Sequence, residues 1–231
     1  MKHQKHRLDI VYEDGSCIVV NKPAGLAVQG GQGIGVSLDD ILAASFAERP
    51  LLVHRLDRDT SGLVLVAKDR RSAAVFSGLM GGATRGVIKR YLAVCRGVPE
   101  KPVGTIRLDL DFRGTVKKSE TRYRLSVGLS GGEFSLLELE LGTGRMHQIR
   151  RHLAMTGNPV LGDDRYGDFA LNRGLRKTHG LRRLLLHAAG LVVPDMPDGS
   201  RLDIEAPLPG YFSGFMELVH TKESPSETDC R

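Results

Sequence analysis

The chain has 231 residues, 41% of them hydrophobic, so it is long and apolar enough to fold around its own core as one large or two small domains. Lys and Arg number 33 against 27 Asp and Glu, and the net charge of +6 favours a polyanionic partner such as nucleic acid. The 3 cysteines lack C-x-x-C spacing and no apolar run approaches the length of a membrane span, which excludes a disulfide framework, a zinc site and a transmembrane helix.

The first third of the chain predicts a hairpin, a helix and a buried strand. Two short apolar runs within residues 8–23 indicate strands joined by a turn at Asp14. A helix over 37–48 begins with Ser37 as its N-cap. Residues 63–67 form a continuous apolar run, which is typical of a strand buried on both faces.

Further along the chain, strand patterns outnumber helical ones. A helix is predicted over 70–80, and the alternation of leucine with glutamate over 134–141 indicates a strand with one buried face. Because clear β-α-β alternation is absent, we expect an α+β fold, with a largely antiparallel mixed sheet flanked by helices and loops. Other strands are expected within 89–97, 103–127, 184–193 and 201–206.

The densest polar cluster of the chain lies between two segments that are predicted to be buried. Residues 54–62 read HRLDRDTSG, and Leu56 is their one apolar side chain apart from glycine. Asp57 lies between Arg55 and Arg58, and an ionised carboxylate at the edge of a core can act as a nucleophile or base. A solvated turn before a strand is the alternative, although a turn needs fewer such residues.

A helix predicted over 146–157 combines an apolar stripe with a basic face. The basic face consists of His147, Arg150 and Arg151, which follow helical spacing. Such a face can bind phosphate, pair with a carboxylate, or simply be solvated. The histidines of this helix lack the i, i+4 spacing of a helical metal pair, so we expect no metal site.

Five segments in order resemble the motifs of the RluA family of pseudouridine synthases, which isomerise uridine in RNA. The resemblance covers about residues 8–218 and implies that family's catalytic core, which needs no metal and no organic cofactor. The segments are NKPAGLAVQGG, HRLDRDTSG, KRYLAVCRG, GTGRMHQIRRHL followed by GNPVLGDDRYG, and RLLLHAAGL.

The resemblance assigns roles to individual residues. It makes Asp57 the essential carboxylate and Arg150 the arginine that pairs with it, which we expect to be a bidentate pair. Tyr91, which from its pattern alone is a half-buried strand tyrosine, becomes the residue that stacks under the uracil and assists proton removal from carbon 5. Arg55 fills the space that a flipped-out uridine leaves.

Besides Arg55, we expect further basic residues and histidines in these segments to contact RNA. His54 is included, although its expected role is mainly to fix the loop. The predicted RNA-binding residues are His54, Arg55, Arg58, Lys89, Arg145, His147 and Arg151.

Two features concern the choice of RNA. The segments GGQG and GDDRYG are most similar to the branch that acts on large-subunit ribosomal RNA. However, the catalytic core begins at about Leu8, which leaves no room for the small N-terminal RNA-binding domain that many ribosomal members carry. We therefore expect a catalytic domain over 8–220 that acts on ribosomal RNA, with transfer RNA as the alternative, and a disordered tail over 221–231.

Other function classes remain as alternatives at this point. A catalytically silent RNA-binding protein need not retain Asp57, Tyr91 and Arg150 together. A glycoside hydrolase needs two separated acids, whereas Asp57 and Asp59 are neighbours on one loop. The basic N-terminus is not followed by an apolar segment, so we expect a cytoplasmic protein without a signal peptide. We also expect it to be a monomer.

Overall fold

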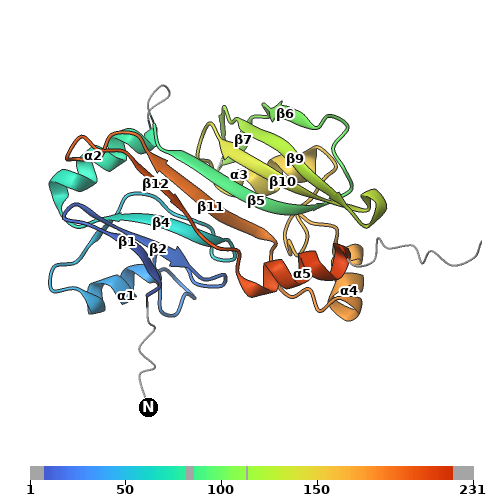
Figure 1. Cartoon of the computed structure of the whole chain (residues 1–231), viewed down its shortest axis with the longest axis horizontal. Coiled ribbons are helices and arrows are strands. Elements are labelled where there is room, and N and C mark those ends of the chain that lie inside the picture. The colour runs from blue at the N-terminus through green and yellow to red at the C-terminus, as the bar shows by residue number, and fades with distance from the viewer. Residues whose placement is uncertain (1–7, 82–85, 113, 221–231) are drawn as a thin grey trace, which may run out of the picture.

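A mixed sheet runs through the whole molecule (Figure 1) in the computed structural model, which describes residues 8–81, 86–112 and 114–220. The tail predicted to be disordered lies outside the described residues. The strand order is β1-β2-β4-β11-β5-β10-β9-β6, with β12 beside β11 and β3 beside β4. All pairs are antiparallel except β4 with β11, which confirms the predicted α+β fold.

The elements have the following bounds. The strands are β1 (Ile10–Glu13), β2 (Cys17–Lys22), β3 (Leu51–Leu52), β4 (Ser61–Ala67), β5 (Ile88–Arg96), β6 (Val103–Ile106), β7 (Leu110–Phe112), β8 (Thr115–Lys117), β9 (Thr121–Leu129), β10 (Phe134–Leu141), β11 (Leu186–Val193) and β12 (Leu202–Glu205). The helices are α1 (Leu38–Ser45), α2 (Arg70–Gly81), α3 (Gln148–Met155), α4 (Phe169–Thr178) and α5 (Gly210–His220), with a 3-10 turn at Ser130–Gly132.

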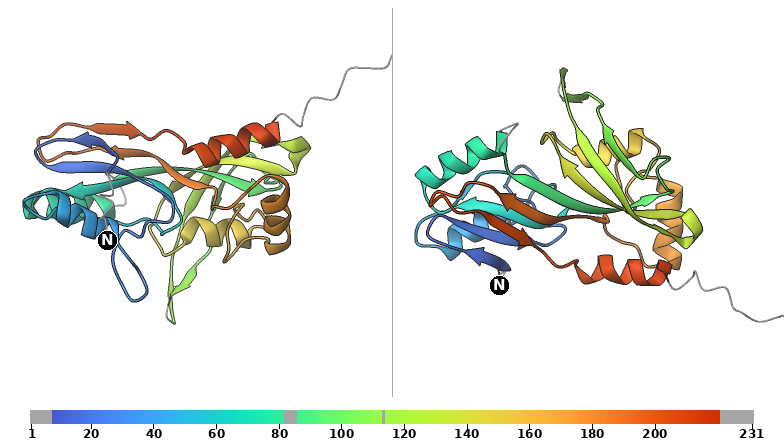
Figure 2. Two further views of the ribbon diagram at one scale, coloured as in Figure 1. Left: turned by 90° about the horizontal axis from the view of Figure 1, so that it is seen from below. Right: turned by 45° about the horizontal axis from the view of Figure 1, so that its top comes forward.

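Helices cover both faces of the sheet. Residues of α1 and α3 share one hydrophobic cluster with β2, β4, β5 and β10. The other face packs against α2 near β12 and against α4 and α5 near β5. Figure 2 shows α5 on the face opposite α1 and α3. None of the described helices has the length and apolar character needed to cross a bilayer.

Several predicted elements are confirmed. β1 and β2 form the expected hairpin, and every residue of β4 is buried. Ser37 caps α1 through a reciprocal capping box with Asp40. The glutamates of β10 form ion pairs with arginines of β9, while the leucines of β10 face the core.

The parallel pair of β4 with β11, called here the β4–β11 seam, joins the N-terminal strands to the rest of the sheet. His187 lies opposite Ser61, and Ala188 lies opposite Gly62. Gly62 has φ +112°, and a Cβ atom there would overlap the backbone of Ala188. The Ser61 hydroxyl contacts His187 Nδ1 at 2.9 Å and the Tyr211 hydroxyl at 3.0 Å, so buried hydrogen bonds reinforce the seam.

Candidate active site

The loop that carries Asp57 leads directly into β4 and is fixed by a buried lysine. Lys22 is fully buried, and its ammonium donates to the carbonyl oxygens of Pro23, Leu26 and Arg58 at 3.0, 2.8 and 3.0 Å. Burial lowers the pKa of Lys22 to about 8. This one side chain therefore ties the NKPAGL loop to the loop of Asp57.

A histidine fixes the start of the same loop. The backbone N–H of Leu65 in β4 donates to Nε2 of His54 at 2.8 Å. Burial lowers the pKa of His54 to about 3, with a smaller contribution from Lys89, so the imidazole stays neutral and accepts this hydrogen bond. This geometry agrees with the expectation that His54 holds the loop.

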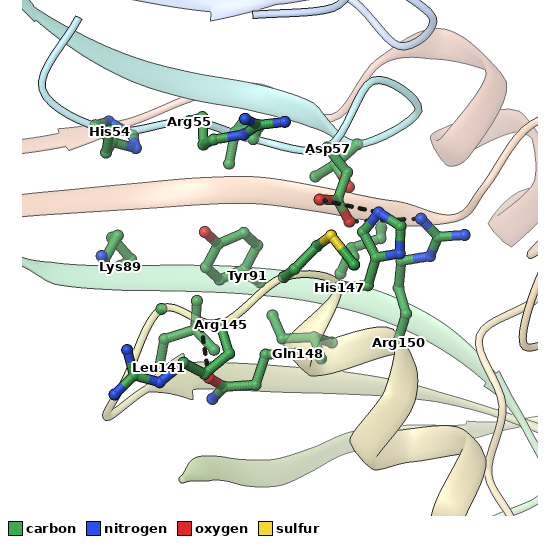
Figure 3. A pocket seen from close by; sticks show the side chains of 16 residues that line it. His54, Arg55, Asp57, Lys89, Tyr91, Leu141, Arg145, His147, Gln148 and Arg150 are labelled. Carbon is green, nitrogen blue, oxygen red and sulfur yellow. Dashed lines mark hydrogen bonds and ion pairs between the residues drawn. The ribbon is translucent and has the colours of Figure 1, made fainter. Parts of the chain in front are cut away.

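A pocket of about 290 Å³ lies beside this loop on the α3 side of the sheet (Figure 3). It brings together segments that are far apart in the sequence, namely the loop before β4, strand β5 and the start of α3. All predicted site residues line it except Arg58 and Arg151. Those that line it are His54, Arg55, Asp57, Lys89, Tyr91, Arg145, His147 and Arg150.

Arg150 contacts Asp57, but its bidentate partner is a different carboxylate. Its NH1 lies 3.4 Å from Asp57 Oδ2. Its Nε and NH2 donate to the two oxygens of Asp163 at 2.7 and 2.8 Å. Asp163 is 1% exposed and also accepts the backbone N–H groups of Arg165 and Tyr166, so it is fully committed. The expectation of a bidentate Arg150–Asp57 pair was therefore wrong.

Sequence reasoning missed Asp163 as part of this site. The residue lies in the segment GDDRYG, and Asp164 beside it is 84% exposed at its side chain. A pair of adjacent aspartates gives no indication of which one points inward. In the structure, burial and the bidentate contact with Arg150 distinguish Asp163.

The basic helical face predicted over 146–157 was also wrong. α3 begins at Gln148, because His147 has a left-handed backbone with φ 53° and precedes the helix. Arg150 is buried rather than exposed, and Arg151 donates to the carbonyl oxygen of Asp111 at 2.9 Å. These three side chains therefore lie in different surroundings, and His147 turns into the pocket.

His147 lies beside Arg150 and approaches the other carboxylate oxygen of Asp57 (Figure 3). Its Nε2 is 3.7 Å from Asp57 Oδ1, and its Nδ1 is 3.0 Å from the hydroxyl of Tyr166. Burial lowers the pKa of His147, although the charge of Asp57 acts in the opposite direction. A neutral imidazole that accepts from Tyr166 presents its Nε2–H toward Asp57.

Tyr91 forms part of the pocket floor on β5. It is 6% exposed, and burial raises the pKa of its phenol, with a further contribution from Asp57. The phenol therefore stays protonated at neutral pH. A planar ring that lies beside a carboxylate suits a stacked base better than it suits general-base catalysis.

The rest of the charge in the pocket lining is positive. Asp57 is the carboxylate of the lining, whereas Arg55, Lys89 and Arg145 contribute cations. Burial lowers the pKa of Lys89, and its hydrogen-bond contact is the sulfur of Met80 at 3.8 Å. In the described part of the chain, no group of three or more His, Cys, Asp or Glu side chains is arranged to hold a metal ion. The pocket therefore suits an anionic ligand that reaches one carboxylate.

Comparisons with known proteins identify the family of this chain. Residues 16–155 match the family model described as RNA pseudouridylate synthase. The ribosomal large subunit pseudouridine synthase C of Rickettsia felis is 37% identical over 222 residues, covering 88% of this chain and 68% of that protein. The protein of the same name from Salmonella typhi is 36% identical over 228 residues, covering 92% and 70%.

Solved structures agree with the sequence relatives. Human RNA pseudouridylate synthase domain containing 4 superposes with a TM-score of 0.75 at 27% identity, covering 91% of this chain and 92% of that one. Human RNA pseudouridylate synthase domain containing 1 gives 0.73 at 26% identity, covering 99% and 100%. The predicted family is thus confirmed, and the chain belongs to the RNA pseudouridylate synthases.

Proposed function

We propose that this protein isomerises specific uridines to pseudouridine in large-subunit ribosomal RNA, with Asp57 as its essential carboxylate. The observation that carries the proposal is a pocket lined by Asp57, whose two oxygens are approached by Arg150 and His147, and by the buried ring of Tyr91. The relatives named as large-subunit ribosomal enzymes support the choice of RNA.

The reaction breaks the bond between the sugar and nitrogen 1 of uracil, turns the base, and joins the sugar to carbon 5. The proton on carbon 5 is then lost and nitrogen 1 gains one, so no oxidation or reduction occurs. Asp57 can attack the sugar, attack the base or remove a sugar proton, and each route needs an ionised carboxylate close to the sugar. Arg150 contacts one oxygen of that carboxylate and helps to orient it, and Tyr91 supports the plane of the base.

The uridine must leave its stack to reach Asp57, at a cost of a few kcal/mol. Arg55 is exposed at the rim of the pocket, where its guanidinium plane can occupy the vacated position. Glycoside hydrolysis is less compatible with the site, because Asp163, the second carboxylate that contacts Arg150, is buried and paired with it.

A pseudouridine map of ribosomal and transfer RNA tests the proposal. We expect cells that lack the gene to lose one or a few signals in large-subunit RNA, read by carbodiimide labelling and primer extension. Loss of signals in transfer RNA alone would overturn the substrate but not the chemistry. An unchanged map, together with an inactive purified protein, would indicate an RNA-binding protein instead.

We further propose that residues 8–220 act as one catalytic domain, and that the protein works as a monomer in the cytoplasm. The continuous sheet supports the single domain, since it carries site residues on β5 and immediately before β4. Light scattering of the purified protein tests the monomer, and a mass of two chains would contradict it.

A further inference from the structure

We propose that a set of exposed cations outside the catalytic pocket binds the phosphate backbone of the RNA that flanks the target uridine. This set, called here the α4 basic patch, extends along α4 and the segment that follows it. The proposal rests on the proposed function and adds a second contact surface to it. The patch consists of Arg173, Arg176, Lys177, Arg182 and Arg183.

The charge of this segment has one sign. Residues 169–194 contain the five cations of the patch and no Asp or Glu. The whole chain, by contrast, has 33 Lys and Arg against 27 Asp and Glu, so its charges are otherwise closely balanced. A local excess of this kind attracts a polyanion.

The side chains of the patch are exposed and largely uncompensated. Within the described residues, Arg173, Lys177 and Arg182 have no hydrogen-bond or ion-pair partner. Arg176 reaches one carboxylate, that of the exposed Asp164, at 3.8 Å. Such cations are free to exchange water and counter-ions for phosphate oxygens, which is the main source of RNA affinity.

A role in stabilising the helix explains only some cations of the α4 basic patch. Cations in the last turn of a helix complement its dipole, and Arg176 and Lys177 lie there. Arg182 and Arg183 come after the end of α4, beyond the reach of that effect. Arg183 is instead held in place, because its NH1 donates to the carbonyl oxygen of Ala24 at 2.9 Å.

The patch is continuous with the catalytic pocket. A second hollow of about 290 Å³ is lined by Arg58, Arg182 and Arg183, and the buried pair of Arg150 with Asp163 also lines it. Of this pair, Arg150 also lines the pocket of Asp57, so the two cavities adjoin at its side chain, while Asp59 and Asp164 add carboxylates to the hollow. Arg58, which does not line the catalytic pocket, lines this hollow with the patch. An RNA strand that delivers a uridine to Asp57 can place neighbouring phosphates over the hollow.

The patch suits backbone binding rather than base reading. Arginine and lysine contacts to phosphate position an RNA without specifying its sequence. The patch would thus strengthen binding of a long structured RNA and contribute less to a short stem-loop. The chemical step at Asp57 would not depend on it.

A double variant tests the patch. Arg173→Gln with Arg182→Gln removes two exposed side chains that have no partner among the described residues, and Arg70→Gln with Arg71→Gln removes two exposed arginines of α2 as the matched control. Figure 1 shows α2 and α4 at opposite ends of the molecule. Binding is measured against salt with a transcript of large-subunit ribosomal RNA and with a short stem-loop around the modified uridine.

We expect the α4 variant to bind the transcript about tenfold more weakly, with the salt slope reduced by about 2, and to lose less affinity for the short stem-loop, while kcat stays unchanged. Arg173→Lys with Arg182→Lys should restore the slope. A dissociation constant and slope equal to those of the α2 control would overturn the patch. Failure of the wild-type protein to form pseudouridine in the transcript would instead contradict the proposed function.

Discussion

Arg150 divides its guanidinium between two carboxylates. Asp163 takes Nε and NH2, and Asp57 receives one long contact from NH1. Arg150 and Asp57 both line the pocket, whereas Asp163 does not. We infer that Asp163 is a positioning residue. It holds Arg150 so that the guanidinium contacts only one oxygen of Asp57.

Replacing Asp57 with Ala should abolish turnover. Among the described residues, the variant loses the one carboxylate that lines the pocket, so we expect the rate of pseudouridine formation to fall more than about a thousandfold. RNA binding and the free energy of unfolding should change little. Asp59→Asn on the same loop is the control, since Asp59 is half-exposed and pairs with Arg58 at the surface. Substantial activity in Asp57→Ala would refute the assignment.

Replacing Asp163 with Asn should affect both stability and rate. Arg150 would remain buried without its bidentate partner, which costs about 3 kcal/mol of unfolding free energy. A released guanidinium can also engage both oxygens of Asp57, so kcat should fall about a hundredfold with KM nearly unchanged. The exposed neighbour Asp164 gives the control Asp164→Asn. Equal kinetics in the two variants would exclude a positioning role for Asp163.

The pH dependence of stability gives a second readout of the same pair. Although burial of Asp163 acts in the opposite direction, Arg150 and two backbone N–H groups hold the pKa of its carboxyl below the usual value of 3.8. A lowered folded-state pKa contributes stability that is present above about pH 4 and lost as the pH falls through the folded-state value. In urea titrations, the stability difference between wild type and Asp163→Asn should therefore shrink below about pH 4. A constant difference would contradict this linkage.

At the scale of secondary structure, sequence patterns predicted the elements that depend on interactions between residues close in the chain. The hairpin, α1 with its cap, and the alternating strand β10 follow from periodicity and turn residues. Neither α4 nor α5 was predicted, because α5 contains two glycines within 210–220 and α4 follows a loop without apolar periodicity. The pairing of β4 with β11 was also not predictable, since its partners lie more than one hundred residues apart.

The candidate site was also predictable in its local motifs but not in its long-range contacts. Its residues could be named from motifs, but their contacts depended on packing that no pattern encodes. The left-handed backbone of His147 shortened the predicted helix, and the choice between Asp57 and Asp163 as bidentate partner depended on which carboxylate is buried. Motifs therefore identified the participants, and the fold determined their arrangement.

Replacing Gly62 with Ala should destabilise the sheet at the seam. The added Cβ would overlap the backbone of Ala188 and also occupy a strained φ, so we expect a loss of about 3 kcal/mol or more in unfolding free energy. Gly33 also has positive φ, at +76°, but open space around it, so Gly33→Ala measures strain alone at about 1 kcal/mol. Similar urea midpoints for the two variants would show that the seam tolerates a methyl group.

For the molecule as a whole, the excess of cations should make RNA binding strongly dependent on salt. The net charge of +6 and the cations that line the pocket predict a linear fall of log affinity with log salt concentration. Filter binding of the ribosomal transcript at several salt concentrations measures the slope. Turnover at saturating RNA should be nearly independent of salt, and affinity that did not change with salt would argue against phosphate contacts.

The β4–β11 seam determines how the catalytic residues lie relative to one another. Asp57 belongs to the part of the chain before β4, whereas Tyr91 and Arg150 belong to the part that includes β5 and α3. The strand ladder between these parts pairs His187 and Ala188 with Ser61 and Gly62. Turnover should therefore depend on whether that short ladder is intact. A cosolvent, ligand or substitution that shifts one part relative to the other should abolish turnover, while the spectroscopic signal of the sheet persists.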